Sequence, residues 1–321
     1  DKGFTKIKYV IRHKCNKKIY RVLTHSGCVD ITEDHSLLNE NGEKITVEEC
    51  SIGDKLLHNN LPINDEKVCD ISEDEAYTMG LFYSDGSCGI YKNGNKSGYK
   101  YSWAINNMNI DFLERAKRGV SAQIYDTVKS SGVYKLIAKG NVKDITLKYI
   151  KMFYDKTKYK KVPKEILNAS NIVKKCFLEG YYDGDKDKNG YTRFDNKGKI
   201  GSSGLLYLYS SLGYKISISD RQDKLNIFRL TCTKNLQRKD SDKIKKIRDL
   251  NYTNDYVYDI ETKNHHFAAG IGRLVVHNTD SAIFSYPNMS VFETFQNAIK
   301  VSKEVSHYLK CSIIGIDENY K

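Results

Sequence analysis

The chain of 321 residues has little proline and no paired cysteine motif. Its three prolines, set against many Tyr, Ile and Lys residues, indicate an AT-rich coding sequence rather than a particular chemistry. The eight cysteines are scattered, without the C-x-x-C pairs that bind zinc or carry out redox reactions. We therefore interpret them as reduced, mostly buried thiols of an intracellular protein.

Long apolar runs are also missing, and the mean hydropathy is −0.58, so the sequence predicts no membrane span. The chain starts at Asp1 rather than at methionine. Its opening, DKGFTKIKYV, has neither the apolar region of a signal peptide nor a helix start, and is typical of the middle of a strand. We expect that the chain is a fragment whose upstream part is missing.

What the chain has in excess is positive charge, with a formal net charge of +12 and a pI of about 9.1. This balance favours a polyanionic partner, most often nucleic acid. The length allows two domains with cores of their own.

The hydrophobic pattern changes three times along the chain. Residues 1–68 alternate apolar and polar positions between turn signals, which predicts short strands. Residues 69–238 combine helix and strand patterns, and residues 239–278 return to short strands. The sequence therefore predicts a mixed fold, in which an inserted α+β domain interrupts one all-β domain. Residues 279–321 differ again and include an amphipathic helix candidate, VFETFQNAIKVSKEVSHYL.

The middle region contains an internal repeat with an offset of 100 residues, which divides it into halves of about 69–165 and 166–238. YTMGLFYSDG and FLEGYYDGDK are both helix candidates with small residues four positions apart. The pairs are Gly80 with Ser84 and Gly180 with Gly184. Residues four apart share a helix face, so each helix has a smooth stripe along which another backbone can approach closely.

The ends of the repeat helices have recognisable signals. Ser72 and Glu75 form the S-x-x-E pattern of a capping box at the start of the first helix. Gly86 fits the left-handed position that follows a last helical turn. Lys186 takes the place of that glycine in the second copy, so we expect a different cap there.

Each repeat helix also ends in an acid, Asp85 or Asp185. An acid is unfavourable at this end because the helix dipole is negative there. Two such ends held together by the small-residue stripes would be costly unless cations bind between them. The repeat therefore predicts a metal-binding acid pair, whereas a single copy would favour ordinary surface aspartates beside turns.

These residues resemble the LAGLIDADG homing endonucleases, whose two motif helices are similar to MGLFYSDG and LEGYYDGD. The resemblance implies that each half is an α/β unit with a saddle-shaped sheet in the major groove of double-stranded DNA, and that a monomer cuts both strands. Asp85 and Asp185 would hold Mg²⁺, which polarises the scissile phosphates and activates water. YKKVPKEIL is similar to the lysine-bearing element of intein-borne members, which makes Lys160 the counterpart lysine, with Lys161 beside it.

Strand-like segments of the middle region supply groups that suit DNA. GYKYSWAINN, GVYKLIAKG and NIFRLTCT place Lys, Arg, Tyr and Asn on candidate sheet faces, where they fit phosphate and base-edge contacts. Plain solvation is the alternative for any one of these side chains. The base-reading residues and the target sequence therefore stay open.

The flanking β segments resemble the splicing domain of inteins, an all-β horseshoe. DITEDHSLL is similar to the T-x-x-H element through Thr32 and His35, and VYDIETKNHHFAAG to the penultimate splicing block through Asp259 and His265. VVHN followed by Thr279 is similar to the terminal block. The resemblance implies that Thr32 and His35 polarise the upstream scissile peptide and that Asp259 assists nearby proton transfers.

The pair His277-Asn278 has the chemistry to break the chain. The amide nitrogen of the Asn278 side chain can attack its own carbonyl carbon, which closes a five-membered succinimide and breaks the bond that follows. His277 is the expected proton donor to the leaving amine. Thr279 would be the nucleophile that first receives the upstream flank as an ester. For a lone His-Asn pair the alternative is a strand end and a turn.

One departure from the intein pattern concerns its start. Inteins open with a Cys or Ser nucleophile several dozen residues before the T-x-x-H element, whereas only 34 residues precede His35 here. We expect the nucleophile to lie outside this chain. The chain alone would then not complete splicing, although cleavage after Asn278 stays chemically possible.

The residues after Asn278 resemble another class of protein. TDSAIF is similar to the downstream half of the D-T-D-S motif of family B DNA polymerases, and NAIKVSKEVSHYLK to the helix that follows it. Asp280 would be a Mg²⁺-binding carboxylate of the polymerase palm, and residues 279–321 the downstream flank of the host.

Two alternatives stay open: a splicing element whose insert only binds DNA, and a DNA-binding maturase or regulator in which the His-Asn pair is incidental.

Overall fold

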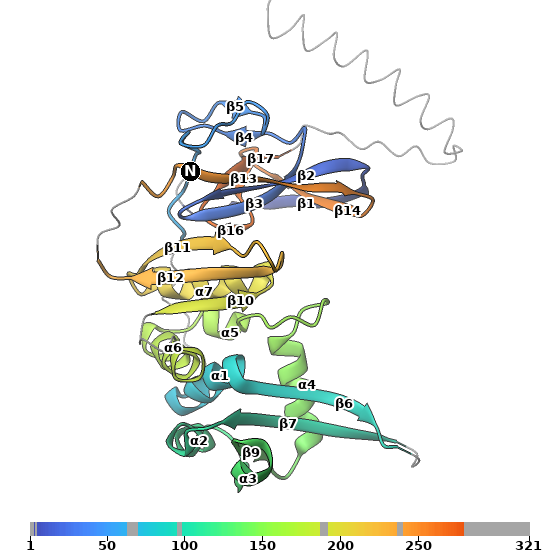
Figure 1. Ribbon diagram of the computed structural model, residues 1–321, viewed down its shortest axis with the longest axis vertical. Coiled ribbons are helices and arrows are strands. Elements are labelled where there is room, and N and C mark those ends of the chain that lie inside the picture. Colours follow the sequence, from blue (N-terminus) through green and yellow to red (C-terminus); the bar gives the residue numbers. More distant parts are fainter. Residues whose placement is uncertain are drawn as a thin grey trace, which may run out of the picture. The chain divides into compact units, whose positions relative to one another are not determined.

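The computed structural model describes Gly3 and residues 5–62, 70–94, 98–186, 192–235 and 240–278 (Figure 1). Thr279, Asp280 and the predicted downstream helix lie outside the described residues. Within the described ranges, no helix is long and apolar enough to cross a bilayer.

Strands from both ends of residues 1–278 pair with one another (Figure 1). Strand β1 (Ile7–Lys14) pairs antiparallel with β14 (Tyr256–Thr262). A second sheet has the order β13-β2-β3-β16, and a third has the order β15-β17-β4-β5. Their strands are β2 (Lys17–Thr24), β3 (Gly27–Thr32), β4 (Leu37–Leu38), β5 (Lys44–Ile45), β13 (Ile244–Thr253), β15 (His266–Ala268), β16 (Ile271–Gly272) and β17 (Val275–His277).

Apolar side chains from these distant strands form one core. Val22 of β2 and Val29 of β3 are buried beside Leu37 and Leu274. Alternate residues of a strand point to opposite faces, so each strand contributes only every second side chain. The segments before and after the middle region therefore share their sheets and their core.

The first half of the middle region is a helix followed by an antiparallel sheet of order β6-β7-β9-β8. Its elements are α1 (Glu73–Asp85), β6 (Gly86–Lys92), β7 (Tyr99–Asn107), α2 (Ile110–Lys117), β8 (Ala122–Asp126), α3 (Val128–Ser131), β9 (Tyr134–Ala138) and α4 (Val142–Phe153). Trp103 of β7 is fully buried and stacks on Phe82 of α1 at 5.5 Å between ring centroids. Tyr149 of α4 meets Phe82 edge-on at 4.7 Å. These aromatic contacts hold one face of the sheet against α1 and α4.

The second half repeats the layout with a sheet of order β10-β12-β11. Its elements are α5 (Lys164–Leu167), α6 (Asn171–Asp185), β10 (Arg193–Lys197), α7 (Lys199–Ser211), β11 (Lys215–Asp220) and β12 (Ile227–Thr233). Phe194 and Phe228 are buried between this sheet and α7. Among the described strands this sheet has three, against four in the first half, so the halves share a layout without matching strand for strand.

The two repeat helices pack with their backbones in contact, as the glycine pattern predicts. A Cβ atom on Gly80 of α1 would lie 1.9 Å from the carbonyl oxygen of Phe177, and one on Gly180 of α6 would lie 2.1 Å from that of Tyr77. No side chain larger than hydrogen fits at either position. The crossing of α1 and α6 therefore depends on both glycines.

The starts and ends of these helices test the predicted caps. The Ser72 hydroxyl accepts a hydrogen bond from the backbone N–H of Glu75 at 3.2 Å, as one half of the capping box requires. The prediction of a left-handed cap at Gly86 is wrong, because its φ is −85° and its ψ is 157°. The chain instead runs directly into β6, and a Cβ on Gly86 would lie 2.2 Å from the Phe82 ring. Glycine is needed there for space.

The prediction of a different cap in the second copy is also wrong. Lys186 has extended backbone angles, with φ −61° and ψ 144°, and its N–H bonds back to the carbonyl of Tyr182. Gly86 makes the same bond to the carbonyl of Phe82. Both helices therefore end alike.

Buried charges link the β sheets to the second half of the middle region. Arg21 of β2 is 1% exposed and donates to both carboxylate oxygens of Asp30 at 2.7 and 2.8 Å. Its remaining Nη1 donates to the carbonyl of Leu225 at 2.7 Å. Asp220 of β11 accepts from Arg248 of β13 at 3.0 Å. Each buried charge has a partner from another element, which fixes how β2 and β13 lie against β11 and β12.

Replacing Gly80 or Gly180 by alanine should separate α1 from α6. Overpacking against a backbone carbonyl leaves no flexible atom to move, so each variant should lose at least about 2 kcal/mol of unfolding free energy. Urea denaturation measures this loss. Lys151→Ala is the control, because Lys151 is an exposed residue of α4. Equal denaturation midpoints for Gly80→Ala and Lys151→Ala would contradict the packing.

Candidate functional site

The C-terminal ends of α1 and α6 bring the two predicted acids to one place. Asp85 is the last residue of α1, and Asp185 is the last residue of α6. A Cβ atom on Gly184 would lie 2.9 Å from Oδ2 of Asp85 and 1.9 Å from Oγ of Ser84. The third small residue of the stripe thus lets the Asp85 carboxylate lie directly against the opposite helix.

The surroundings of both carboxyls disfavour their charged forms. Burial raises the pKa of Asp85, although hydrogen bonding from Asn107 and the charge of Lys160 oppose the shift. Asn107, at the end of β7, donates to Oδ2 of Asp85 at 2.6 Å. Burial raises the pKa of Asp185 to about 6, and the charge of Asp85 adds to the rise. The Tyr181 hydroxyl donates to Oδ2 of Asp185 at 3.1 Å.

Lys160 reaches the same place from outside both helices. Its Nζ donates to the carbonyl oxygens of Phe82 and Tyr83, each at 2.9 Å, and of Gly86 at 2.6 Å. Burial lowers its pKa to about 8, and the charge of Asp85 opposes the shift. The ammonium group therefore neutralises the negative end of α1 beside Asp85.

The donor set at this place suits a hard divalent cation. Two carboxylates that are costly to ionise together meet here, and Mg²⁺ prefers carboxylate oxygen ligands. Asn107 presents its amide NH2 to Asp85, and its oxygen accepts from the backbone N–H of Asn109. In the part of the chain that the structure describes, neither carboxylate forms an ion pair with a lysine or arginine side chain. The described residues also contain no cluster of three or more His, Cys, Asp or Glu side chains suited to a metal ion. Asp85 and Asp185 are therefore the residues of this place that could hold a divalent cation.

The second candidate site lies at the end of β17, where Asn278 is only 2% exposed. Its backbone N–H donates to the carbonyl of His265 at 3.0 Å. Its side-chain Nδ2 donates to the carboxylate of Glu261. Its Oδ1 is buried without a partner among the described residues. The side-chain amide of Asn278 is therefore fixed at its nitrogen, while its buried oxygen has no hydrogen-bond partner among the described residues. An unpaired buried oxygen costs folding free energy, which marks Asn278 as a candidate reactive residue.

His277 lies at the bond that Asn278 would break. Its Nδ1 is 2.5 Å from the carbonyl oxygen of Asn278. The His265 ring is nearly parallel to it, with 6.5 Å between the centroids, and His265 has a φ of +60°. The sequence predicted that His277 protonates the leaving amine. The structure places its Nδ1 at the carbonyl oxygen of Asn278, to which the tautomer with its proton on Nδ1 can donate.

The other predicted splicing residues gather around the same strands. The Thr32 hydroxyl is hydrogen-bonded to Asp34, and the N–H of His35 donates to the carbonyl of Thr32 at 3.1 Å. Burial lowers the pKa of His35, with the charge of Asp259 opposing the shift and that of His277 adding to it. Asp259 of β14 is 8% exposed. His35 and Asp259 therefore lie within electrostatic reach of each other, and His35 within reach of His277.

Two residues of these sites were not predicted from the sequence. Asn107 ends a strand in the first half and binds Asp85. Glu261 follows Asp259 by two residues in β14 and binds Asn278. The period of a strand could have revealed Glu261, since residues two apart share a face. Nothing local marks Asn107.

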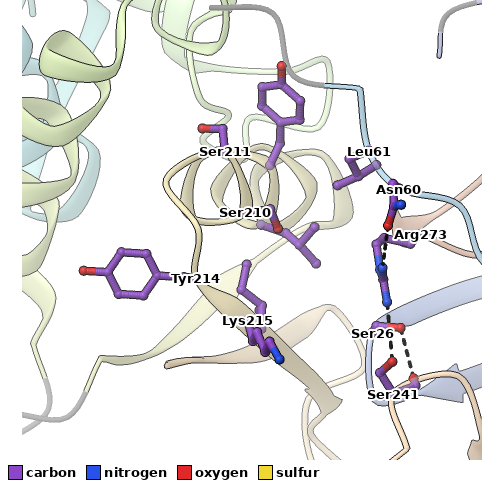
Figure 2. A pocket seen from close by; sticks show the side chains of 12 residues that line it. Ser26, Asn60, Leu61, Ser210, Ser211, Tyr214, Lys215, Ser241 and Arg273 are labelled. Carbon is purple, nitrogen blue, oxygen red and sulfur yellow. Dashed lines mark hydrogen bonds between the residues drawn. The ribbon is translucent and has the colours of Figure 1, made fainter. Parts of the chain in front are cut away.

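A cavity of about 460 Å³ lies apart from all the predicted site residues (Figure 2). Ser210 and Ser211 of α7, Tyr214 and Lys215 line one side. On the other side Arg273 donates to Oδ1 of Asn60 at 3.3 Å and to Oγ of Ser241 at 3.4 Å. Arg273 precedes β17, so the cavity adjoins the segment that leads to Asn278.

Comparison with known proteins gives several relatives, although no family model matches the chain. A DNA polymerase of Acanthamoeba polyphaga mimivirus is 49% identical over 301 residues, which are 89% of this chain and 17% of the relative. A DNA polymerase of Thermococcus sp. is 26% identical over 387 residues, which are 98% of this chain and 22% of the relative. Transcription initiation factor IIB of Methanocaldococcus jannaschii is 23% identical over 301 residues, which are 86% of this chain and 41% of the relative. The chain thus spans less than half the length of each of these relatives.

Among solved structures, mesophilic variants of the homing endonuclease I-DmoI are similar to 51% of this chain, with a TM-score of 0.39, 19% identity and 89% of that chain covered. An I-DmoI variant in complex with its nicked target DNA and Mn has a TM-score of 0.39 and 18% identity, and covers 51% of this chain and 90% of that chain.

Stability should depend on pH through Asp185. Its pKa is about 6 in the folded protein, against about 3.9 in an unfolded chain. The folded form holds this proton more tightly, so it loses stability as pH rises from about 4 through about 6. Asp185→Asn should therefore gain stability relative to the wild type over that window and level off above it, as measured by urea unfolding in EDTA. Added Mg²⁺ at pH 7.5 should reduce the difference in unfolding free energy between Asp185→Asn and the wild type. A difference that does not change with pH would contradict the raised pKa of Asp185.

Proposed function

We propose that the chain is an intein whose all-β splicing domain, a horseshoe, is interrupted by a LAGLIDADG homing endonuclease. The observation that carries the proposal is the glycine-lined crossing of α1 and α6, which ends with Asp85 and Asp185 side by side. A helix pair built only for stability would not place two acids at its negative ends. The insert would cleave both strands of double-stranded DNA at a specific site, as a monomer.

In the endonuclease, each residue has a distinct task. Asp85 and Asp185 would hold Mg²⁺, which would polarise the scissile phosphate and lower the pKa of water. Asn107 orients the Asp85 carboxylate through its 2.6 Å hydrogen bond. Lys160 stabilises the end of α1 and supplies positive charge beside the phosphate. Its pKa of about 8 keeps most of its ammonium protonated at neutral pH.

The sheets of the two halves are the proposed DNA-binding surfaces. Their outer residues include the exposed Tyr91 and Tyr99 of the first half, and Lys92 and Lys100 pair with them across β6 and β7. Lysine ammonium groups bind phosphates and tyrosine rings contact bases or sugars. The net charge of +12 favours the same partner.

In the splicing domain, the buried Asn278 is the residue that breaks the chain. Its Nδ2 attacks its own carbonyl carbon, His277 stabilises the oxyanion from 2.5 Å, and the bond to Thr279 breaks. Thr279 would act before this step as the acceptor of the upstream flank. His35 and Asp259 form the neighbouring acid–base pair, with Thr32 fixing the turn before His35.

The relatives support an insert rather than a polymerase domain. The same stretch is similar to parts of proteins named DNA polymerase and of one named transcription initiation factor IIB. A mobile segment explains two unrelated hosts, whereas a polymerase domain does not. We infer that this chain interrupts a family B DNA polymerase in an intracellular setting. Thr279 then begins the downstream flank, and Asp280 is a Mg²⁺ ligand of the rebuilt polymerase.

Asp85→Asn and Asp185→Asn should each slow DNA cleavage by at least about 100-fold, because a ligand to the catalytic cation is lost. The substrate is a randomised library of double-stranded DNA with Mg²⁺, and sequencing of the cut ends identifies the site. Asp74→Asn, at the opposite end of α1, is the control and should cut normally. DNA binding without cleavage by the unmodified chain would instead favour the alternative of a DNA-binding insert.

Asn278→Ala should abolish release of residues 279–321 from the full chain, since no other side chain can form the succinimide. His277→Ala should slow release by about 100-fold through loss of one oxyanion donor. Mass spectrometry of the products over time measures both rates, with Asn168→Ala on the surface of the middle region as the control. Unchanged release of residues 279–321 in Asn278→Ala would contradict the proposed splicing function.

A further inference from the structure

Glu261 lies beside the reacting amide, within the segment similar to the penultimate splicing block, but the resemblance gives it no role. It is 9% exposed in β14, on the same face as Asp259. Its Oε2 accepts the hydrogen bond from Nδ2 of Asn278. Its other oxygen, Oε1, lies 3.2 Å from Nζ of Lys8 and 3.5 Å from Nδ1 of His265. The carboxylate is therefore held at one oxygen while the other points at the amide.

This hydrogen bond is the one that fixes the Asn278 side chain. Its Oδ1 has no partner among the described residues, so the bond to Glu261 alone decides where the nitrogen points. An amide nitrogen is a weak nucleophile because its lone pair is delocalised into the carbonyl. A base that accepts the N–H proton while the new bond forms keeps positive charge from building up on the nitrogen, which contributes about 100-fold or more to a rate.

We propose that Glu261 is the base of the Asn278 cyclisation, a role that rests on the proposed splicing function. As the bond forms between Nδ2 and the carbonyl carbon of Asn278, one proton passes from Nδ2 to Oε2 of Glu261. The bond to the nitrogen of Thr279 then breaks, and that nitrogen takes up the proton from Glu261. Proton and electron counts balance, and Glu261 returns to its starting form.

His277 and Glu261 then have separate roles in the cyclisation. His277 lies at the carbonyl oxygen, 2.5 Å away, and stabilises the charge that develops there. Glu261 lies at the nucleophile. The proton that the leaving amine needs thus comes from the attacking amide through Glu261, and His277 is free to remain at the oxygen.

The test is the release of residues 279–321 from the full chain, followed by mass spectrometry. Glu261→Gln keeps the shape and a hydrogen-bond acceptor but removes the base, so release should slow by about 100-fold or more. Glu261→Ala should regain rate in proportion to added formate, which a purely structural role would not allow. Glu43→Gln is the matched control, because Glu43 also accepts from an asparagine amide, that of Asn39 at 2.8 Å, but on the surface. An unchanged rate in Glu261→Gln, or no response to formate, would overturn the proposal.

A second measurement separates this proposal from the splicing function itself. If the unmodified chain does not release residues 279–321, the proposed splicing function fails. The contact of Glu261 with Asn278 is then tested by the NMR resonance of the Asn278 side-chain amide. That resonance, assigned by its loss in Asn278→Ala, should shift in Glu261→Gln and stay in place in Glu43→Gln. A resonance that does not move in Glu261→Gln overturns the contact and the role built on it.

Discussion

The contact of two helix backbones is the constraint on which the middle region depends. Side chains normally keep helix axes 8–10 Å apart, but Gly80 and Gly180 let α1 and α6 meet carbonyl to Cα. The same stripe continues to Gly184, beside the Asp85 carboxylate. Close packing and the paired acids are thus one feature. Any side chain that separates the helices also separates the carboxylates.

A similar dependence holds at the end of the proposed splicing domain. Asn278 is buried directly after β17, which pairs with β15 and β4, strands from the two sides of the middle region. Its carbonyl oxygen, its amide nitrogen and its own N–H each contact a different partner: His277, Glu261 and His265. These contacts therefore exist only after the two β segments have paired. Under the proposed splicing function, folding is then a condition for breaking the chain.

Local patterns in the sequence predicted the features that depend on local periodicity. Glycines four residues apart mark a helix face, and the offset of 100 residues pairs one such face with another. The cap at Gly86 was predicted wrongly because turn chemistry does not register the Phe82 ring that fills the space. The contacts of Lys160 with α1, and of Arg21 with Leu225, join residues far apart in the chain. No local rule predicts them, since they depend on how the completed elements pack.

The ends of α1 and α6 are proposed to form one divalent metal site. Crystals of the chain soaked in Mn²⁺, measured by anomalous diffraction, test it without any assay of activity. We expect an anomalous peak within about 2.5 Å of carboxylate oxygens from both Asp85 and Asp185. A structure in which Mn²⁺ binds elsewhere, while a lysine ammonium lies between the two carboxylates, would contradict this metal site.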